Sequence, residues 1–149
     1  MKQKLPITDL AVIKQMLPHR EPMLFVDSLI SYSESSIVSQ LTISASNIFV
    51  QNNQFQEAGL LENMAQTVAL HTGYKAMFSE ATPRIGYIGA IKKATFERLP
   101  SVGDDITTEA IITYNALDMT RVDVAVFLEK KRIARATMTT ILKPETNEA

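Results

Sequence analysis

One carboxylate stands among apolar residues in the stretch FQEAGLLENMAQTVALHTGY, residues 55–74. At helical spacing this stretch presents one apolar face, formed by Ala58, Leu61, Ala65, Val68 and Ala69. Three neighbouring residues widen this face: Leu60, Met64 and Thr67. Glu62 lies within this surface and Gln66 follows one turn later, so the two side chains point the same way. A carboxylate in so apolar a setting requires an explanation, which makes Glu62 a candidate functional residue.

The structural alternatives for these two residues stay open at this point. Glu62 could accept hydrogen bonds from loop amides and anchor the start of the helix. Gln66 could orient Glu62, or it could join the helix to a neighbouring strand by a hydrogen bond.

Few other side chains could complete an acid–base pair. The chain has two histidines, His19 and His71, and no cysteine, which excludes a thiolate nucleophile, disulfides and zinc sites that need Cys ligands. His71 follows Glu62 by nine residues, which puts it on the opposite face of a helix. His19, in the segment LPHR, is therefore a second catalytic candidate, with a structural role as its alternative. Nothing in the sequence indicates a metal or an organic cofactor.

The patterns around this helix predict an α+β fold in one domain, residues 1–149. Thr8 and Asp9 can cap a short N-terminal helix that ends by residue 16, and residues 144–149 form a frayed polar tail. Alternating apolar residues predict strands over residues 24–30, 37–43, 84–98, 106–114, 122–128 and 134–142. Residues 46–56 are expected to form an irregular loop, and the last four strands an antiparallel meander. A highly curved sheet of about six strands wrapped around the long central helix satisfies this order.

Composition narrows the classes of partner. The formal net charge is −1 and 21% of residues are charged, so no global attraction to nucleic acid or anionic membrane is expected. No apolar run approaches the length of a membrane span, and the N-terminal residues lack the apolar core of a signal peptide. We therefore expect a cytoplasmic protein.

Three segments resemble successive signature regions of the hotdog-fold 3-hydroxyacyl-acyl-carrier-protein dehydratases: LPHREPMLFVDSL, LLENMAQTVA and IGAIKKATFERLPSVGDDI. The resemblance implies that Glu62 is the catalytic carboxylate of a reaction that eliminates water from a 3-hydroxyacyl thioester. It also implies an acyl carrier protein as partner. A homodimer paired through edge strands would protect the sheet edges.

The chain departs from this family in the loop before the long helix. The family places a catalytic histidine there, within an HFPG-like motif, and this histidine works opposite the carboxylate across the dimer interface. Ile48 stands in its position, and Gln56 and Glu57 replace the Pro-Gly pair. The sequence is similar in this respect to the dehydratase-like proteins of aryl-polyene clusters, which are associated with a second dehydratase-like subunit. A heteromer with such a subunit is thus the alternative to a homodimer.

The resemblance suggests further contacts with substrate. Gly59 lies at the helix start, where family members use backbone N–H groups to polarise the thioester carbonyl. Tyr87, Gly89 and Phe96 match a strand that lines the acyl tunnel in the family. Basic residues that could meet the acidic carrier protein are Lys92, Lys93, Arg98, Lys130, Lys131 and Arg132.

Two other functions remain open from the sequence. The missing loop histidine favours a noncatalytic subunit that binds the acyl chain or stabilises an active partner. A hotdog thioesterase would also use a helix carboxylate and helix-end amides, but it would hydrolyse the thioester.

Overall fold

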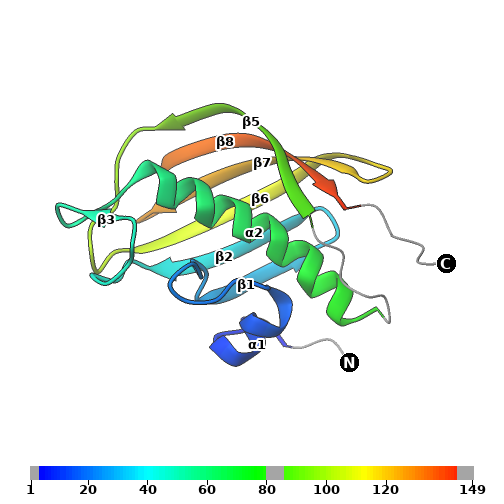
Figure 1. Cartoon of the computed structure of the whole chain (residues 1–149), viewed down its shortest axis with the longest axis horizontal. Helices are drawn as coiled ribbons and strands as arrows, with labels where there is room; N and C mark the ends of the chain where they lie inside the picture. The colour runs from blue at the N-terminus through cyan, green and yellow to red at the C-terminus, as the bar shows by residue number, and fades with distance from the viewer. Residues whose placement is uncertain (1–3, 80–85, 144–149) are drawn as a thin grey trace.

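A six-stranded antiparallel sheet lies against one long helix (Figure 1). The computed structural model describes residues 4–79 and 86–143. In chain order its elements are α1 (Leu10–Met16), β1 (Ser28–Ser33), β2 (Ser36–Thr42), β3 (Val50–Gln51), β4 (Gln54–Phe55), α2 (Glu57–Met77), β5 (Gly86–Phe96), β6 (Asp105–Ala116), β7 (Met119–Leu128) and β8 (Lys131–Leu142). This confirms the predicted α+β hotdog architecture. The predicted strand start at Arg84, the chain break at residues 80–83 and the frayed tail at 144–149 lie outside the described residues.

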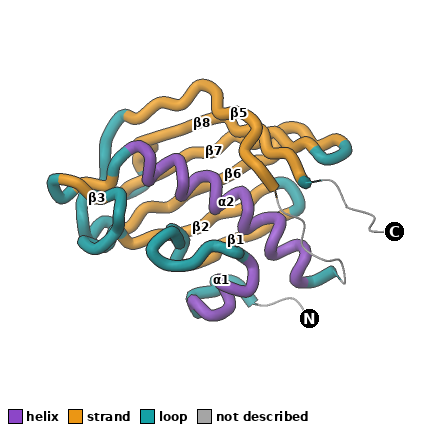
Figure 2. The backbone as a smooth tube through the Cα atoms, viewed as in Figure 1, coloured by secondary structure: helices purple, strands orange, loops and turns teal. Residues whose placement is uncertain are grey.

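The order of the strands differs in one respect from the predicted meander. The sheet runs β1-β2-β6-β7-β8-β5, so β6, β7 and β8 form a meander but β5 pairs with β8. The reason is that β2 already occupies the other edge of β6, with seven paired positions. The chain therefore passes over one face of the sheet as α2 and then adds β5 at the edge opposite to β1, as Figure 2 shows.

Alternation along the central strands places the core between the sheet and α2. Along β7, Val122, Val124, Val126 and Leu128 are buried, whereas Arg121 and Asp123 are exposed. The facing side of α2 carries Leu60, Met64 and Leu70, which are also fully buried. The two elements thus share one continuous hydrophobic core.

The buried face of α2 is not the one expected from its apolar residues. Ala58 is exposed, and Leu61, Ala65 and Ala69 are only partly buried. The face that packs on the sheet instead carries several polar residues, whose hydrogen bonds are described below. The smaller apolar residues lie on the opposite side, where they line a cavity.

Two local predictions were wrong. Residues 24–27 do not belong to β1, which begins at Ser28, because the backbone N–H and carbonyl of Phe25 bond to side chains of α2. The loop before α2 contains a short hairpin, β3–β4, whose two turn residues Asn52 and Asn53 both have positive φ, 53° and 65°. Asparagine tolerates this left-handed conformation better than most residues, so the pair NN between VQ and QF was a usable hairpin signal.

The short helix α1 docks on the C-terminal half of α2. Asp9 caps it as predicted, since its carboxylate accepts a hydrogen bond from the Ala11 N–H at 2.9 Å. At the other end, α1 approaches α2 so closely that a Cβ on Gly73 would clash with the Met16 carbonyl oxygen. Gly73 is therefore required for this contact. Among the described residues, no helix is long and apolar enough to span a membrane.

Replacing Gly73 by alanine should separate α1 from α2. The new Cβ meets backbone, which cannot rotate away, and we expect a loss of at least about 2 kcal/mol in the free energy of unfolding despite the ~1 kcal/mol that alanine gains as a helix former. Urea denaturation measures the change. Gly86→Ala is the matched control, because its Cβ would lie 3.5 Å from Leu142 Cδ2, an ordinary contact. Equal stability of the two variants would contradict this account of the packing.

Candidate active site

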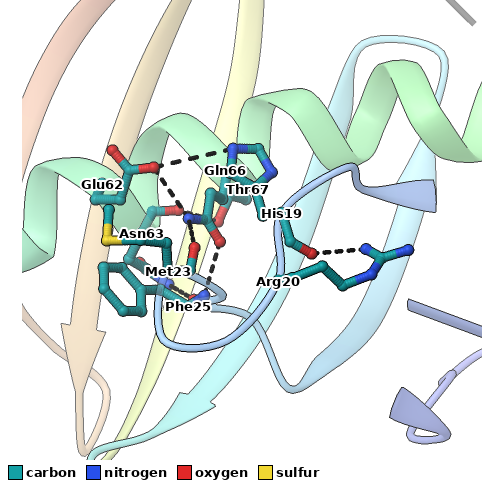
Figure 3. A network of polar contacts seen from close by, with 8 residues as sticks. All are labelled: His19, Arg20, Met23, Phe25, Glu62, Asn63, Gln66 and Thr67. Atoms are coloured by element: carbon teal, nitrogen blue, oxygen red, sulfur yellow. Dashed lines mark hydrogen bonds and ion pairs between the residues drawn. The ribbon is translucent and has the colours of Figure 1, made fainter. Parts of the chain in front are cut away.

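The side chain of Gln66 joins α2 to residues 23–25, a segment that crosses the helix and that we call the strap. Its Oε1 accepts a hydrogen bond from the Phe25 N–H at 2.7 Å, and its Nε2 donates to the Met23 carbonyl at 2.8 Å. The second Nε2 hydrogen is directed to Glu62 Oε1, at 3.0 Å. Gln66 is fully buried, and all of its amide groups are used (Figure 3). It therefore both orients Glu62 and anchors the strap.

Glu62 is fixed by this bond at the boundary between protein and cavity. Its side chain retains 32% of its possible exposure, so it is not the fully buried carboxylate that the sequence suggested. Only Oε1 is held by Gln66, and within the described residues Oε2 makes no hydrogen bond. The carboxylate is thus oriented by the protein and accessible at the same time.

The structure brings His19 to Glu62. His19 Nε2 lies 3.9 Å from Glu62 Oε1. The imidazole of His19 comes from the loop after α1, and it faces the carboxylate of Glu62 on α2 (Figure 3). This separation is too long for a direct hydrogen bond. The other ring nitrogen, Nδ1, is buried and has no hydrogen-bond partner in the described part of the chain.

Arg20 holds the His19 loop in place from the other side. Its guanidinium donates to the carbonyl oxygens of Leu17 at 2.8 Å, His19 at 2.6 Å and Lys14 at 3.0 Å. Two of these carbonyls belong to the C-terminal turn of α1, where they have no partner within the helix. The guanidinium of Arg20 is therefore occupied by backbone carbonyl groups.

Asn63 is a second anchor of the strap that the sequence reasoning missed. Its Nδ2 donates to the Phe25 carbonyl at 2.8 Å, and its Oδ1 accepts from the Thr108 hydroxyl on β6 at 2.6 Å. A neighbouring pair, Ser39 and Thr67, joins β2 to the same stretch of helix at 2.7 Å. The signal was an amide and a hydroxyl in a helix otherwise rich in apolar residues, because such groups must find partners when buried.

Glu62 and His19 open onto a cavity of about 710 Å³. Its polar lining residues include Lys14, Gln15 and Arg20. Beyond them the wall is apolar or small, formed by Ala65, Val68, Ala69, Thr72, Gly73, Ala76 and Met77 of α2 and by Tyr87, Ile88 and Leu142 of the sheet edge. From residue 65 to residue 77 the helix wall is about 18 Å long. The cavity suits an elongated apolar chain with a polar head group.

Of the other residues predicted to contact substrate, only some line this cavity. Tyr87 lines the cavity and is 54% exposed. Gly59, Gly89 and Phe96 are not among its lining residues. A Cβ on Gly59 would clash with the ring of Phe55 and with Phe49 Cβ, and Gly89 lies at an irregularity of β5 near the side chain of Ile141.

The predicted basic residues lie away from this cavity. Lys93 and Arg132 border a shallow hollow of about 410 Å³ on the face of the sheet opposite α2, together with Arg135. Two acidic residues, Glu109 and Asp123, share the hollow, so its charge is mixed. Of the basic residues predicted to meet a carrier protein, only Lys93 and Arg132 therefore share this hollow.

His71 is removed from the site, as its helical position predicted. Its Nε2 bonds to the Ser33 carbonyl at 2.9 Å, and its ring stacks on Tyr32 with centroids 4.7 Å apart. Burial lowers the pKa of His71 below its ordinary value of 6.5, with a smaller opposing contribution from the bond to Ser33. Its position is that of a structural histidine between α2 and β1.

The curved sheet, the long helix and the carboxylate beside an apolar cavity define the class of hotdog proteins that handle acyl thioesters. The family model for ApeP-like dehydratases matches residues 11–149, and the chain belongs to that family. The 3-hydroxyacyl-[acyl-carrier-protein] dehydratase FabZ of Listeria welshimeri is 33% identical over 108 residues, which are 70% of this chain and 75% of that protein. FabZ of Staphylococcus aureus is 33% identical over 111 residues, covering 72% and 75%.

Solved structures support the same fold. A chain of the dehydratase heterocomplex ApeI:P from Xenorhabdus doucetiae superposes with a TM-score of 0.84 at 14% identity, covering 96% of this chain and 94% of that one. A hypothetical thioesterase from Streptococcus pneumoniae, solved with coenzyme A, gives a TM-score of 0.64 at 11% identity, covering 80% and 87%. At these identities the likeness establishes the hotdog fold.

Replacing Gln66 by methionine should loosen the strap and free Glu62. The change leaves the Phe25 N–H and the Met23 carbonyl without their partners, and we expect a loss of about 2–4 kcal/mol in the free energy of unfolding. Chemical denaturation measures it. Gln54→Met, at an exposed position of β4, should change stability by less than about 0.5 kcal/mol. A Gln66 variant as stable as the control would show that these hydrogen bonds do not hold the strap.

Burial of His71 should make the protein less stable in acid. Because the pKa of His71 is lowered by folding, the unfolded chain binds its proton first as the pH falls through 6.5, and stability drops from there down to the folded-state pKa. The charged groups facing the ring, Lys75 and Glu34, act in opposite directions. We expect the wild type to lose stability as the pH falls below about 6.5. His71→Gln should flatten this dependence in pH-resolved melting curves, and an unchanged slope would contradict the prediction.

Proposed function

We propose that this chain is a dehydratase, or a dehydratase subunit, that removes water from 3-hydroxyacyl thioesters carried on an acyl carrier protein. The observation that carries the proposal is the position of Glu62: an oriented, accessible carboxylate at the polar end of a long apolar cavity. Elimination of water needs one group that takes the C2 proton and one that protonates the departing C3 hydroxyl. Glu62 is the proton-transfer group in this proposal.

The comparisons give the reaction its substrate class. The curated FabZ relatives are named for 3-hydroxyacyl chains on acyl carrier protein, and the chain belongs to the ApeP-like dehydratases. The cavity accommodates the acyl chain along α2, with the thioester and the hydroxyl at the end occupied by Glu62 and His19. The carrier protein would dock at the surface, where Lys93, Arg132 and Arg135 border the hollow on the sheet.

A second subunit is part of the proposal. The structural neighbour ApeI:P is a dehydratase heterocomplex, and β5 forms an edge of the sheet with exposed Tyr87, Ile88 and Ile91. A dehydratase-like partner pairing at this edge would cover these side chains. Such a pairing would also close the cavity, since Tyr87 and Ile88 line it.

The noncatalytic alternative has one specific observation in its favour. Ile48, which replaces the family's loop histidine, is 51% exposed and provides no proton-transfer group. In this alternative the chain would bind the acyl chain or stabilise an active partner without performing chemistry. The thioesterase alternative rests on the fold alone.

Glu62→Gln should abolish dehydration, because glutamine keeps the size of the side chain but cannot exchange a proton. We expect at least about a 100-fold loss of kcat on a 3-hydroxyacyl carrier-protein substrate, assayed with the chain alone and with its co-purifying dehydratase-like subunit. Glu21→Gln is the matched control, since this exposed carboxylate lies on the same loop as His19 and pairs with Lys14 at 2.6 Å.

The products separate the three functions. A 2-enoyl thioester formed by the wild type and lost in Glu62→Gln supports the dehydratase. Release of a free acid would establish the thioesterase instead. Equal turnover by wild type and Glu62→Gln in the presence of the second subunit would assign the chemistry to that subunit.

A further inference from the structure

Resting on the proposed function, we infer that Asn63 is a positioning residue of the dehydration, which holds Glu62 in its reactive orientation through the strap and Gln66. Asn63 is fully buried and is not among the residues that line the cavity, so it acts through other groups. A series of hydrogen bonds leads from β6 through its amide to the carboxylate. Figure 3 shows the part of this series that starts at Asn63.

The hydrogen bonds of this series are continuous. On β6 the Thr108 hydroxyl donates to Asn63 Oδ1 at 2.6 Å, and Asn63 Nδ2 donates to the Phe25 carbonyl of the strap at 2.8 Å. The Phe25 N–H donates to Gln66 Oε1 at 2.7 Å, and Gln66 Nε2 donates to Glu62 Oε1 at 3.0 Å. Because Asn63 and Gln66 lie three positions apart on α2, they hold the two backbone groups of Phe25 as a pair.

Solvent cannot take the place of the Asn63 amide. Asn63, Thr108 and Phe25 are all fully buried. A buried carbonyl or hydroxyl that loses its partner keeps the cost of its desolvation, so the strap would be stabilised by moving to a place where the Phe25 carbonyl is paired. Such a movement carries the Phe25 N–H away from Gln66. The amide of Gln66 can then turn away from Glu62.

The strap also positions the second polar side chain of the site. The Met23 N–H donates to the Arg20 carbonyl at 2.8 Å, which closes the turn directly before the strap. His19 precedes Arg20 in the chain and lies 3.9 Å from Glu62. A shift of the strap therefore changes the orientation of Glu62 and its separation from His19 together.

A neighbouring contact of the same kind provides a comparison. Ser39 of β2 lies directly opposite Thr108 in the register of the sheet, and its hydroxyl also reaches a polar residue of α2, Thr67, at 2.7 Å. The Thr67 hydroxyl in turn donates to the Asn63 carbonyl at 2.8 Å, which is a bond within the helix. Both contacts join the sheet to α2 through buried hydroxyl groups, but only the contact of Thr108 continues to the strap. They separate anchoring of the helix from positioning of the carboxylate.

Substitutions at the two contacts test the inference in the dehydratase assay, with the second dehydratase-like subunit present. Asn63→Leu removes both hydrogen bonds of the amide at nearly unchanged size, Thr108→Val removes only the bond to the sheet, and Ser39→Ala removes the comparison contact. We expect Asn63→Leu to lower kcat about 100-fold, an effect that a displacement of about 1 Å can reach. Its KM should change less than about threefold, because Asn63 does not line the cavity. Thr108→Val should lower kcat about tenfold, and Ser39→Ala less than about threefold.

Amide hydrogen exchange, resolved for Phe25 by NMR, follows the strap without any substrate. The Phe25 N–H should exchange at least about tenfold faster in Asn63→Leu than in the wild type, because its bond to Gln66 is weakened. In Ser39→Ala its exchange should be unchanged. Equal exchange of Phe25 in Asn63→Leu and the wild type would show that Asn63 does not hold the strap, and the inference would be wrong.

The kinetic outcomes are equally distinct. If Asn63→Leu keeps kcat within about threefold of the wild type, the inference is wrong. If Ser39→Ala lowers kcat as far as Thr108→Val does, the loss follows a general loosening of α2, and the inference is also wrong. Should melting curves show that Asn63→Leu does not fold, the comparison of Thr108→Val with Ser39→Ala still decides.

The proposed function and this inference can fail separately. Loss of activity in Glu62→Gln together with full activity in Asn63→Leu would leave the proposed function intact and remove only the inference. Full activity in Glu62→Gln would overturn both, whatever the exchange rate of Phe25.

Discussion

The site depends on one buried amide. Gln66 uses its oxygen on the strap, one hydrogen on the strap and the other on Glu62, so the position of the carboxylate and the path of residues 23–25 are fixed by the same group. A buried amide with any of these bonds missing would destabilise the fold by about 1–3 kcal/mol. The orientation of Glu62 is therefore maintained by the energetics of folding rather than by contacts that serve catalysis alone.

The two sides of α2 perform different tasks, and this explains its unusual composition. One side packs on the sheet and carries amides and hydroxyls, because Asn63 and Thr67 must reach β6, β2 and the strap. The other side carries small apolar residues such as Ala65 and Ala69, which line the cavity. Apolar residues on both sides remove the contrast that normally identifies the buried face of a helix. The helix thus has a core side and a cavity side, and neither is polar in the ordinary sense.

This division shows what the sequence could and could not predict. The long helix and the strands that follow it in the chain were predicted from local patterns, whereas the catalytic role expected of Glu62 rested on the resemblance to the dehydratase family. The buried face of α2 was not predicted correctly, because periodicity finds apolar residues without saying whether protein or an empty cavity lies beside them. The meeting of His19 with Glu62 was also beyond local reasoning, since 43 positions of chain separate them and the strap that joins them depends on Gln66 and Asn63. Residue types supplied the candidates, and only the fold supplied their pairing.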